Sequence, residues 1–102
     1  MRQLVVLYPH PPDPDAFRRY YEETHVPLVH ALPGLVGFRY AFDVDGIGGD
    51  APYFCVAELD YEDQSSLATS FASPEGKAAV ADVANFATEP VVRLVLDVQE
   101  SR

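Results

Sequence analysis

The sequence predicts one α+β domain over residues 1–102, in the order strand, helix, strand, strand, helix, strand. Four short runs rich in β-branched and aromatic residues alternate in this order with two longer stretches of helical periodicity. Each helical stretch contains a capping residue followed directly by proline, a pair typical of helix starts. This order is the split βαβ pattern of ferredoxin-like folds, in which a four-stranded antiparallel sheet carries its helices on one face.

The first strand is predicted over residues 3–8, an apolar run buried on both faces, and the prolines after it forbid regular structure. Asp13 can cap a helix and Pro14 suits its first position, so the first helix is expected to begin there. It is expected to run to about Val26. Pro27 lacks an amide hydrogen and is expected to end or kink the helix immediately after His25.

The inward face of this first helix is predicted to be mostly aromatic, with one imidazole in its middle. Helical spacing places six residues on that face: Phe17, Tyr20, Tyr21, Thr24, His25 and Leu28. Charged residues occupy the opposite face. Residues 28–32 are expected to form a second short turn, which Pro33 and Gly34 stop.

The second half of the chain predicts a hairpin, a helix and a final strand. Strands are expected over residues 35–42 and 53–59, joined by a glycine-rich acidic loop. A helix is expected from Asp63, restarted at Ser73 and Pro74 and continuing to about Phe86 or Ala87. The last strand is predicted over residues 91–98.

Both faces of the predicted sheet are apolar. Strand alternation assigns one face, suited to cover by the helices, to Leu4, Val6, Tyr8, Phe38, Tyr40, Cys55, Ala57, Leu94 and Leu96. The other face is assigned Val5, Leu7, Phe54, Val56 and Val95, with Arg39, Glu58, Arg93 and Asp97. A bulge could shift this parity, but both faces would remain apolar. Because an apolar face of this size is not left in water, we expect a homodimer whose two sheets pack face to face into a barrel.

The composition excludes several classes of partner. A formal net charge of −9 does not fit nucleic acid or an anionic membrane surface, since both require a basic footprint. No apolar run approaches the roughly 20 residues that span a bilayer, and the N-terminus lacks a signal-peptide pattern. The single cysteine, Cys55, allows no internal disulfide and fits a reducing compartment. We therefore expect a cytoplasmic protein.

Several blocks, in order along nearly the whole chain, resemble the EthD family of dimeric α+β barrels, named for ethyl tert-butyl ether degradation. They are Leu4-Val-Val-Leu-Tyr-Pro9, Phe17 with Tyr20-Tyr21 and His25-Val-Pro27-Leu28, Leu32-Pro-Gly34, Phe71-Ala-Ser-Pro-Glu-Gly76 and Asp82-Val-Ala-Asn-Phe86. The resemblance implies a ferredoxin-like protomer, a two-fold dimer, and a pocket between the helices and the sheet. The founding members accompany a cytochrome P450 ether-degrading system. Relatives with the same barrel include cofactor-free monooxygenases, lactone isomerases and polyketide cyclases or dehydratases.

His25 is the principal candidate for chemistry, and it recurs in the motif that the family resemblance rests on. A neutral imidazole can accept a proton from a weakly acidic C–H or O–H bond, which suits enolisation, dehydration or isomerisation. A position near a helix C-terminus would favour its charged form. The competing interpretation is a core histidine that is hydrogen-bonded to a backbone carbonyl or a tyrosine.

Aromatic residues are the further candidates for the site. Tyr20 and Tyr21 share the helix face of His25, and their hydroxyls could orient a carbonyl or stabilise an enolate. The expected ligand-binding residues are Tyr8, Phe17, Phe38 and Tyr40. For each tyrosine, packing with one hydrogen-bond partner is the competing interpretation.

Other polar residues predict less. Arg39 or Arg93 could bind a carboxylate substrate, but an ion-pair network inside the dimer barrel is the favoured interpretation. The aspartates of the loop at residues 43–52 lack the remaining ligands of a calcium loop, so no metal site and no cofactor are expected. Asp82 is expected to cap or brace the turn that ends at Phe86.

Two functions remain open from the sequence. One is an enzyme that carries out cofactor-independent proton transfer or oxygen chemistry on an apolar or aromatic, oxygenated small molecule, with His25 as acid or base. The other is a non-catalytic binding or accessory protein that supports an oxygenase of the P450 type. A third possibility is a purely structural dimer with a filled pocket.

Overall fold

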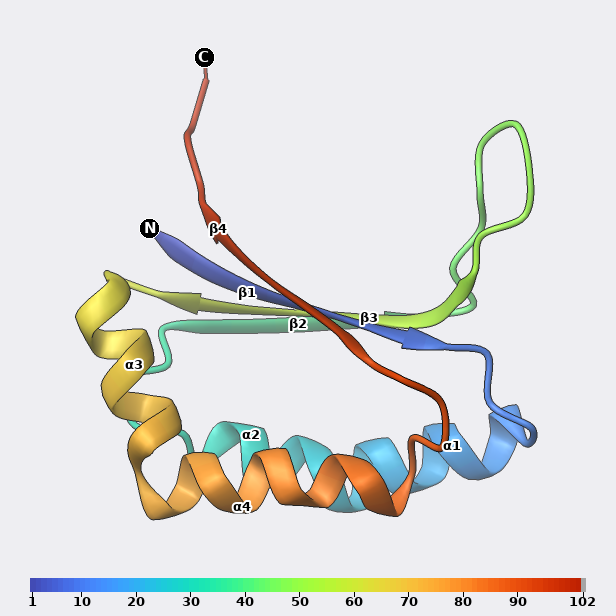
Figure 1. Cartoon of the computed structure of the whole chain (residues 1–102), viewed down its shortest axis with the longest axis horizontal. Coiled ribbons are helices and arrows are strands. Elements are labelled where there is room, and N and C mark those ends of the chain that lie inside the picture. The colour runs from blue at the N-terminus through green and yellow to red at the C-terminus, as the bar shows by residue number, and fades with distance from the viewer. Residues whose placement is uncertain (102) are drawn as a thin grey trace.

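A four-stranded antiparallel sheet in the order β2-β3-β1-β4 forms one layer of the structure, a computed structural model that describes residues 1–101. The strands are β1 (Arg2–Pro9), β2 (Gly37–Phe42), β3 (Tyr53–Tyr61) and β4 (Val92–Asp97). All the helices lie on one face of this sheet (Figure 1). The predicted α+β, ferredoxin-like order and the pairing of β2 with β3 are confirmed. The boundaries differ by a few residues, since β2 begins later and β3 ends later than predicted.

The first helical stretch is longer than the sequence predicted. It comprises α1 (Pro14–Tyr20), a π-helical turn (Tyr21–His25) and α2 (Val26–His30) without interruption. Asp13 caps its start, as predicted, by accepting a hydrogen bond of 3.1 Å from the amide of Ala16.

Of the two outcomes expected at Pro27, an end of the helix after His25 does not occur, and the helix instead continues through an irregular turn. The amide of Val26 donates to the carbonyl of Tyr21, five residues back, and the turn before the proline is therefore wider than an α-helical turn. A widened turn leaves room for the proline ring, which in an α-helix meets the carbonyl four residues back. The same turn moves the inward face along by one residue. Thr24, predicted to face inward, is exposed, and Val29 is buried instead.

The second helical stretch consists of α3 (Gln64–Ala72), α4 (Pro74–Asp82) and a 3-10 turn (Val83–Asn85). Ser73 caps α4 by accepting from the amide of Gly76 at 3.0 Å, and Pro74 occupies the first turn, as predicted. Gly76 has a steric reason to be glycine, since a Cβ there would lie 2.3 Å from the carbonyl oxygen of Ser70. None of the helices among the described residues has the length and apolar character needed to cross a membrane.

The register of β4 contradicts the predicted assignment of its side chains. Val95 lies opposite Leu4 and Arg93 opposite Val6, and directly paired residues share a face of the sheet. Arg93 and Val95 are therefore on the face covered by helices, whereas Leu94 and Leu96 are on the uncovered face. The alternation of the strand places Val92, Leu94 and Leu96 on one side, but both sheet faces are apolar, so alternation could not tell which face that side joins, and pairing with β1 decides it.

Phe54 also lies on the opposite side from its predicted face. The register of β1 and β3 shifts between Tyr8 and Pro9, where the ladder is irregular. Phe54 is buried against Phe17 of α1, with ring centroids 5.4 Å apart. The irregularity thus adds one more aromatic ring to the layer between sheet and helices.

The uncovered face of the sheet carries a row of apolar side chains beside a charged cluster. The apolar members are Val5, Leu7, Val56, Leu94 and Leu96, of which the two leucines are 45% and 41% exposed. Arg39 pairs with Glu58 at 3.1 Å and with Asp60 at 2.9 Å on the same face. Of the two apolar faces that the sequence predicts, one is covered by the helices and the other is uncovered in the protomer.

Candidate functional site

His25 lies in the layer between sheet and helices, where the π-helical turn directs it inward. Its side chain is only 4% exposed. The imidazole packs between Tyr21, at 5.2 Å between ring centroids, and Phe86, at 4.8 Å. A polar ring enclosed in this way is stable only if its nitrogens find partners or contact a hydrated space.

Asp82, at the C-terminal end of α4, supplies one of those partners. Its Oδ2 is 3.0 Å from Nδ1 of His25, although the two residues are 57 positions apart in the sequence. Its Oδ1 accepts from the Tyr20 hydroxyl at 2.6 Å and from Nδ2 of Asn85 at 3.0 Å. The bond from Asn85 fits the predicted bracing of the turn. The bond to His25 was not anticipated, because no local pattern joins the two helices.

The protonation states of this pair follow from its surroundings. Burial raises the pKa of the Asp82 carboxyl, but hydrogen bonds from Tyr20, Asn85 and His25 outweigh burial and leave that pKa below its ordinary value. Burial lowers the pKa of His25, and Asp82 offsets only part of this effect. At neutral pH the carboxylate is ionised and the imidazole is neutral, with its proton on Nδ1.

The expectation that the helix dipole would favour a charged His25 is therefore wrong. The helix continues to His30, so His25 lies inside the stretch rather than at its C-terminal end. The effect of a helix dipole falls off within the last turn, and burial determines the pKa instead.

Nε2 of His25 is the nitrogen left for chemistry. Nε2 has no hydrogen-bond partner among residues 1–101. Every side-chain nitrogen or oxygen in this range that is completely inaccessible to solvent does have a partner, so Nε2 is not completely inaccessible. Nε2 therefore keeps contact with open space. A neutral ring with its proton held on Nδ1 by a carboxylate presents a lone pair at Nε2, as a general base requires.

That space is a cavity between the sheet, α2 and α4. It encloses about 40 Å³ open to water-sized molecules, within about 420 Å³ of empty space that includes its mouth. The lining is mostly aliphatic, with four polar exceptions: Tyr8, Tyr21, His25 and Arg93. The enclosed part holds a few waters or the reacting end of a ligand, whose remainder would occupy the mouth.

Tyr8 and Tyr21 are the hydroxyl-bearing residues of this lining. Tyr8 is 2% exposed and Tyr21 is fully buried, and their ring centroids lie 5.8 Å apart. Burial raises the pKa of both phenols well above the ordinary value. Both remain protonated at neutral pH. The Tyr21 hydroxyl donates to Tyr8, which leaves the Tyr8 proton to donate to an oxygen that gains negative charge.

The other aromatic candidates lie outside this cavity. The Tyr20 hydroxyl is bonded to Asp82, and its ring borders a separate hollow of about 230 Å³ together with Phe17 and Phe86. Tyr40 donates to Glu22 at 2.8 Å on an exposed part of the surface, and Phe38 packs beside Tyr40. Of the four predicted ligand-binding residues, only Tyr8 lines the space next to His25.

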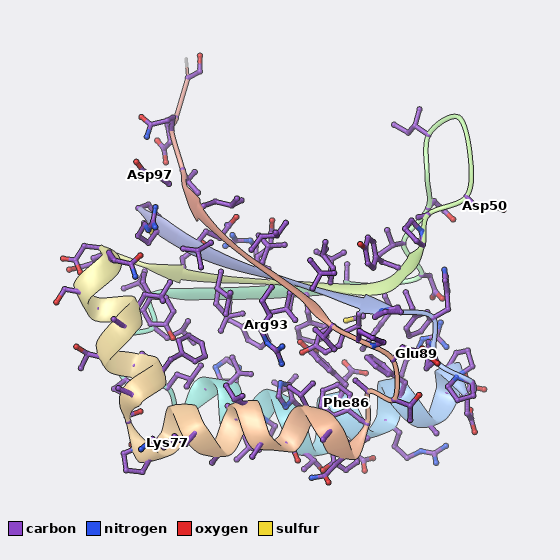
Figure 2. The ribbon with its side chains drawn as sticks, in the orientation of Figure 1. Asp50, Lys77, Phe86, Glu89, Arg93 and Asp97 are labelled. Carbon is purple, nitrogen blue, oxygen red and sulfur yellow. The ribbon has the colours of Figure 1, made fainter. Side chains whose placement is uncertain are left out.

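The two arginines considered from the sequence lie on opposite faces. Arg39 belongs to the charged cluster of the uncovered face. Arg93 lines the cavity, and Figure 2 shows its side chain extending from β4 toward the helices. Sequence alternation alone had placed both on one face.

Three further features of the described residues do not form a second site like the one at His25. A more open hollow of about 600 Å³ lies at the loop of residues 43–52, but it has none of the groups around His25. No three histidine, cysteine or acidic side chains within residues 1–101 are grouped to hold a metal ion. Cys55 is buried, and burial raises the pKa of its thiol to about 12.

Comparison with known proteins gives matches in sequence and structure. The sequence pattern of the EthD domain family matches residues 10–90. An uncharacterised 11.0 kDa protein from the thcB-thcC intergenic region of Rhodococcus erythropolis is 41% identical over 98 residues, which cover 95% of this chain and 94% of that protein. The crystal structure of an EthD family protein from Bacillus halodurans has a TM-score of 0.89 at 30% identity, covering 97% of this chain and 99% of that one.

More distant structures share the fold alone. A dimeric ferredoxin-like protein of unknown function from Thermobifida fusca has a TM-score of 0.70 at 15% identity, with 95% of this chain and 89% of that one covered. A cofactor-independent oxygenase from Streptomyces nogalater has a TM-score of 0.66 at 14% identity, with 98% and 93% covered.

Proposed function

The chain belongs to the EthD family, and from this premise we propose that it is a cofactor-independent enzyme that removes a proton from an apolar, oxygenated small molecule. His25 is the proposed base and the cavity beside it the proposed binding site. The observation that carries the proposal is the buried His25–Asp82 pair, which fixes the proton on Nδ1 and leaves Nε2 to the cavity.

The surrounding groups fit this chemistry. Nε2 would take a proton from a C–H bond next to a carbonyl, and the electron pair of that bond would move to the carbonyl oxygen as an enolate. The Tyr8 hydroxyl, which accepts from Tyr21, is the donor available for that oxygen. Asp82 would stabilise the imidazolium formed in this step, and Tyr20 would position Asp82.

An enolate formed here has several possible fates, which include reprotonation at another carbon, loss of a leaving group and reaction with molecular oxygen. The fold is shared with the cofactor-independent oxygenase named above, which supports oxygen chemistry as one outcome. The aliphatic lining supports an apolar or aromatic ligand body. A cytoplasmic location, expected from the single cysteine, belongs to the same proposal.

We also propose that two copies pair through the uncovered face of the sheet. The exposed Leu94 and Leu96 form an apolar row with the neighbouring valines of β1 and β3, and water disfavours such a row. A ferredoxin-like structure with the same fold is dimeric. Pairing would bring two sheets face to face, as the sequence predicted.

Hydrogen–deuterium exchange into an activated C–H bond tests the enzyme proposal. The probe is 2-tetralone, an aromatic ketone with acidic α-hydrogens, followed by NMR in D₂O. The wild-type protein is expected to accelerate exchange over buffer, and His25→Asn to remove about 10²–10⁴-fold of the acceleration. Arg39→Gln, on the opposite face, is the matched control. Equal exchange by wild type and His25→Asn would contradict a role of His25 as base.

The second candidate is a non-catalytic protein that holds an apolar ligand for an oxygenase. The largely aliphatic lining and the small enclosed space favour it. This function predicts that 2-tetralone binds equally well to wild type and His25→Asn without accelerated exchange in either.

A further inference from the structure

We infer that Arg93 is a specificity-determining residue of the cavity and that the natural ligand carries a carboxylate, which the Arg93 guanidinium binds. This inference rests on the proposed binding site, and it adds the chemical class of the ligand. Neither the fold nor the family match indicates a charged ligand.

The placement of Arg93 is set by the backbone. Arg93 pairs with Val6 across the β1–β4 ladder, and Val6 is a buried residue of the cavity lining. The side chain of Arg93 therefore extends into the layer between sheet and helices, as Figure 2 shows. Arg93 lines the cavity and is nevertheless an exposed residue, which places it at the mouth of the cavity, in front of the buried aliphatic residues.

Arg93 is not part of an ion pair among residues 1–101, unlike two other arginines in the same range. Arg18 pairs with Asp15 and Asp43, and Arg39 pairs with Glu58 and Asp60. The one acidic side chain buried next to the cavity, Asp82, already accepts hydrogen bonds from Tyr20, His25 and Asn85. The guanidinium fork of Arg93 is thus available to a ligand.

Charge favours an anion at this position. The chain carries a formal net charge of −9, so a positive group facing an apolar cavity is an exception to its surface. A guanidinium binds a carboxylate through two parallel hydrogen bonds, a geometry that also fixes orientation. A ligand held this way at the mouth would direct its hydrocarbon part, and any acidic C–H bond on it, toward His25. The positive charge would also stabilise the negative charge that develops when that proton leaves.

A pair of probes of equal size tests the inference: 2-naphthoate, which carries a carboxylate, and 2-naphthamide, which is neutral. Dissociation constants are measured by isothermal titration calorimetry on the wild-type protein and on Arg93→Gln. The wild type is expected to bind 2-naphthoate at least about tenfold more tightly than 2-naphthamide. Arg93→Gln is expected to remove this preference while changing 2-naphthamide affinity less than about twofold, and Arg93→Lys to retain part of it.

Arg39→Gln is the matched control, since it removes an equal charge from the opposite face. Equal binding of the two probes by wild type, absence of binding by both, or equal loss in Arg39→Gln and Arg93→Gln would each overturn the inference. A loss of dimer in Arg93→Gln with an unchanged preference would also overturn it, because Arg93 would then serve the partner subunit.

The inference can fail or hold independently of the proposed catalysis. His25→Asn is expected to lose exchange of the neutral 2-tetralone but to keep its preference for 2-naphthoate. A carboxylate preference that depends on Arg93 in a protein without exchange activity would support the anion site and reject the enzyme.

Discussion

The charged groups on the two faces of this sheet differ in their contact with solvent. On the uncovered face, Arg39 lies with Glu58 and Asp60 in contact with solvent, which already stabilises these charges. On the covered face, Asp82 and His25 are buried, and three hydrogen bonds on one carboxylate replace the lost water. Burying an ionised group without partners costs several kcal/mol or more, so the second arrangement must be nearly complete to persist.

This difference shows where to look for function. Solvated pairs of the first kind are common on protein surfaces and tolerate change. A buried carboxylate that holds an imidazole at one nitrogen, while the other nitrogen meets a cavity, adds little that an apolar pair could not add to stability. Its special property is the fixed tautomer of His25.

Substitution at Asp82 is expected to have the largest effect. In Asp82→Asn an amide can donate to Nδ1, so the imidazole would carry its proton on Nε2 and lose its lone pair toward the cavity. Exchange of 2-tetralone is expected to fall by about 10²–10⁴-fold, with a loss of about 1–3 kcal/mol in unfolding free energy. Asp82→Glu, which keeps the charge, is expected to recover part of the exchange rate. NMR of the His25 ring nitrogens would report the tautomer directly. An unchanged tautomer in a folded Asp82→Asn would remove the positioning role of Asp82.

A charge on the uncovered face is expected to abolish pairing of two copies. Leu94→Asp places a carboxylate in the apolar row, and its desolvation would weaken association at least about 100-fold. Light scattering coupled to size exclusion would show a monomer at concentrations where the wild type is a dimer. Thr88→Asp, at an exposed site outside the sheet, is the control. A wild-type protein that is itself monomeric would contradict the proposed dimer.

The pH dependence follows from the lowered pKa of His25. In the unfolded chain His25 gains a proton below its ordinary pKa of about 6.5, whereas in the folded protein it resists protonation until lower pH. The unfolded state then binds more protons, so the stability contributed by His25 is present above this range and falls as the pH decreases below about 6.5. Thermal melts of wild type between pH 7.5 and 5.5 are expected to show this decrease, and His25→Asn to show less of it. The same titration would produce an acidic limb in the exchange rate.

Arg39→Gln is expected to have the smallest effect. Within one protomer its partners are in contact with solvent and remain so after the change, so the melting temperature, measured at concentrations where the protein is monomeric, is expected to move by no more than about 2 °C. Exchange of 2-tetralone should be unchanged. A large loss of exchange in this variant would mean that Arg39 affects the site at His25, and the two faces of the sheet would then not be independent.

Much of the fold follows from local features of the sequence. Asp13 with Pro14 and Ser73 with Pro74 specify helix starts through short-range hydrogen bonds and a fixed proline φ. The alternation of apolar residues in residues 38–42 and 55–61 specifies which side of β2 and β3 meets the helices. The inward position of His25 also follows from helical spacing, since the π-helical turn moves Thr24 outward but retains His25.

Other features could not be obtained from local patterns. Pro27 is a strong signal for a helix end, and only the widened turn before it shows how the helix continues. Residues 92–97 alternate between an apolar and a mostly charged side, but both faces of the sheet are apolar, so the side to which Arg93 points depends on the partner strand. Asp82 is an acidic residue directly after the apolar run of residues 78–81, but its distance along the chain from His25 conceals the pairing.

The sequence by itself thus determined the order of elements, their caps, and an aromatic helix face with one histidine, because these depend on contacts between near neighbours. The tertiary structure alone decided the carboxylate partner of that histidine, the cavity beside it, and the arginine at its mouth. These depend on the packing of α4 against the first helical stretch and on the register of β4 against β1. Both depend on contacts between residues that are far apart in the sequence. The core is close-packed, so each side chain buried on the sheet restricts which side chains the helices can bury against it.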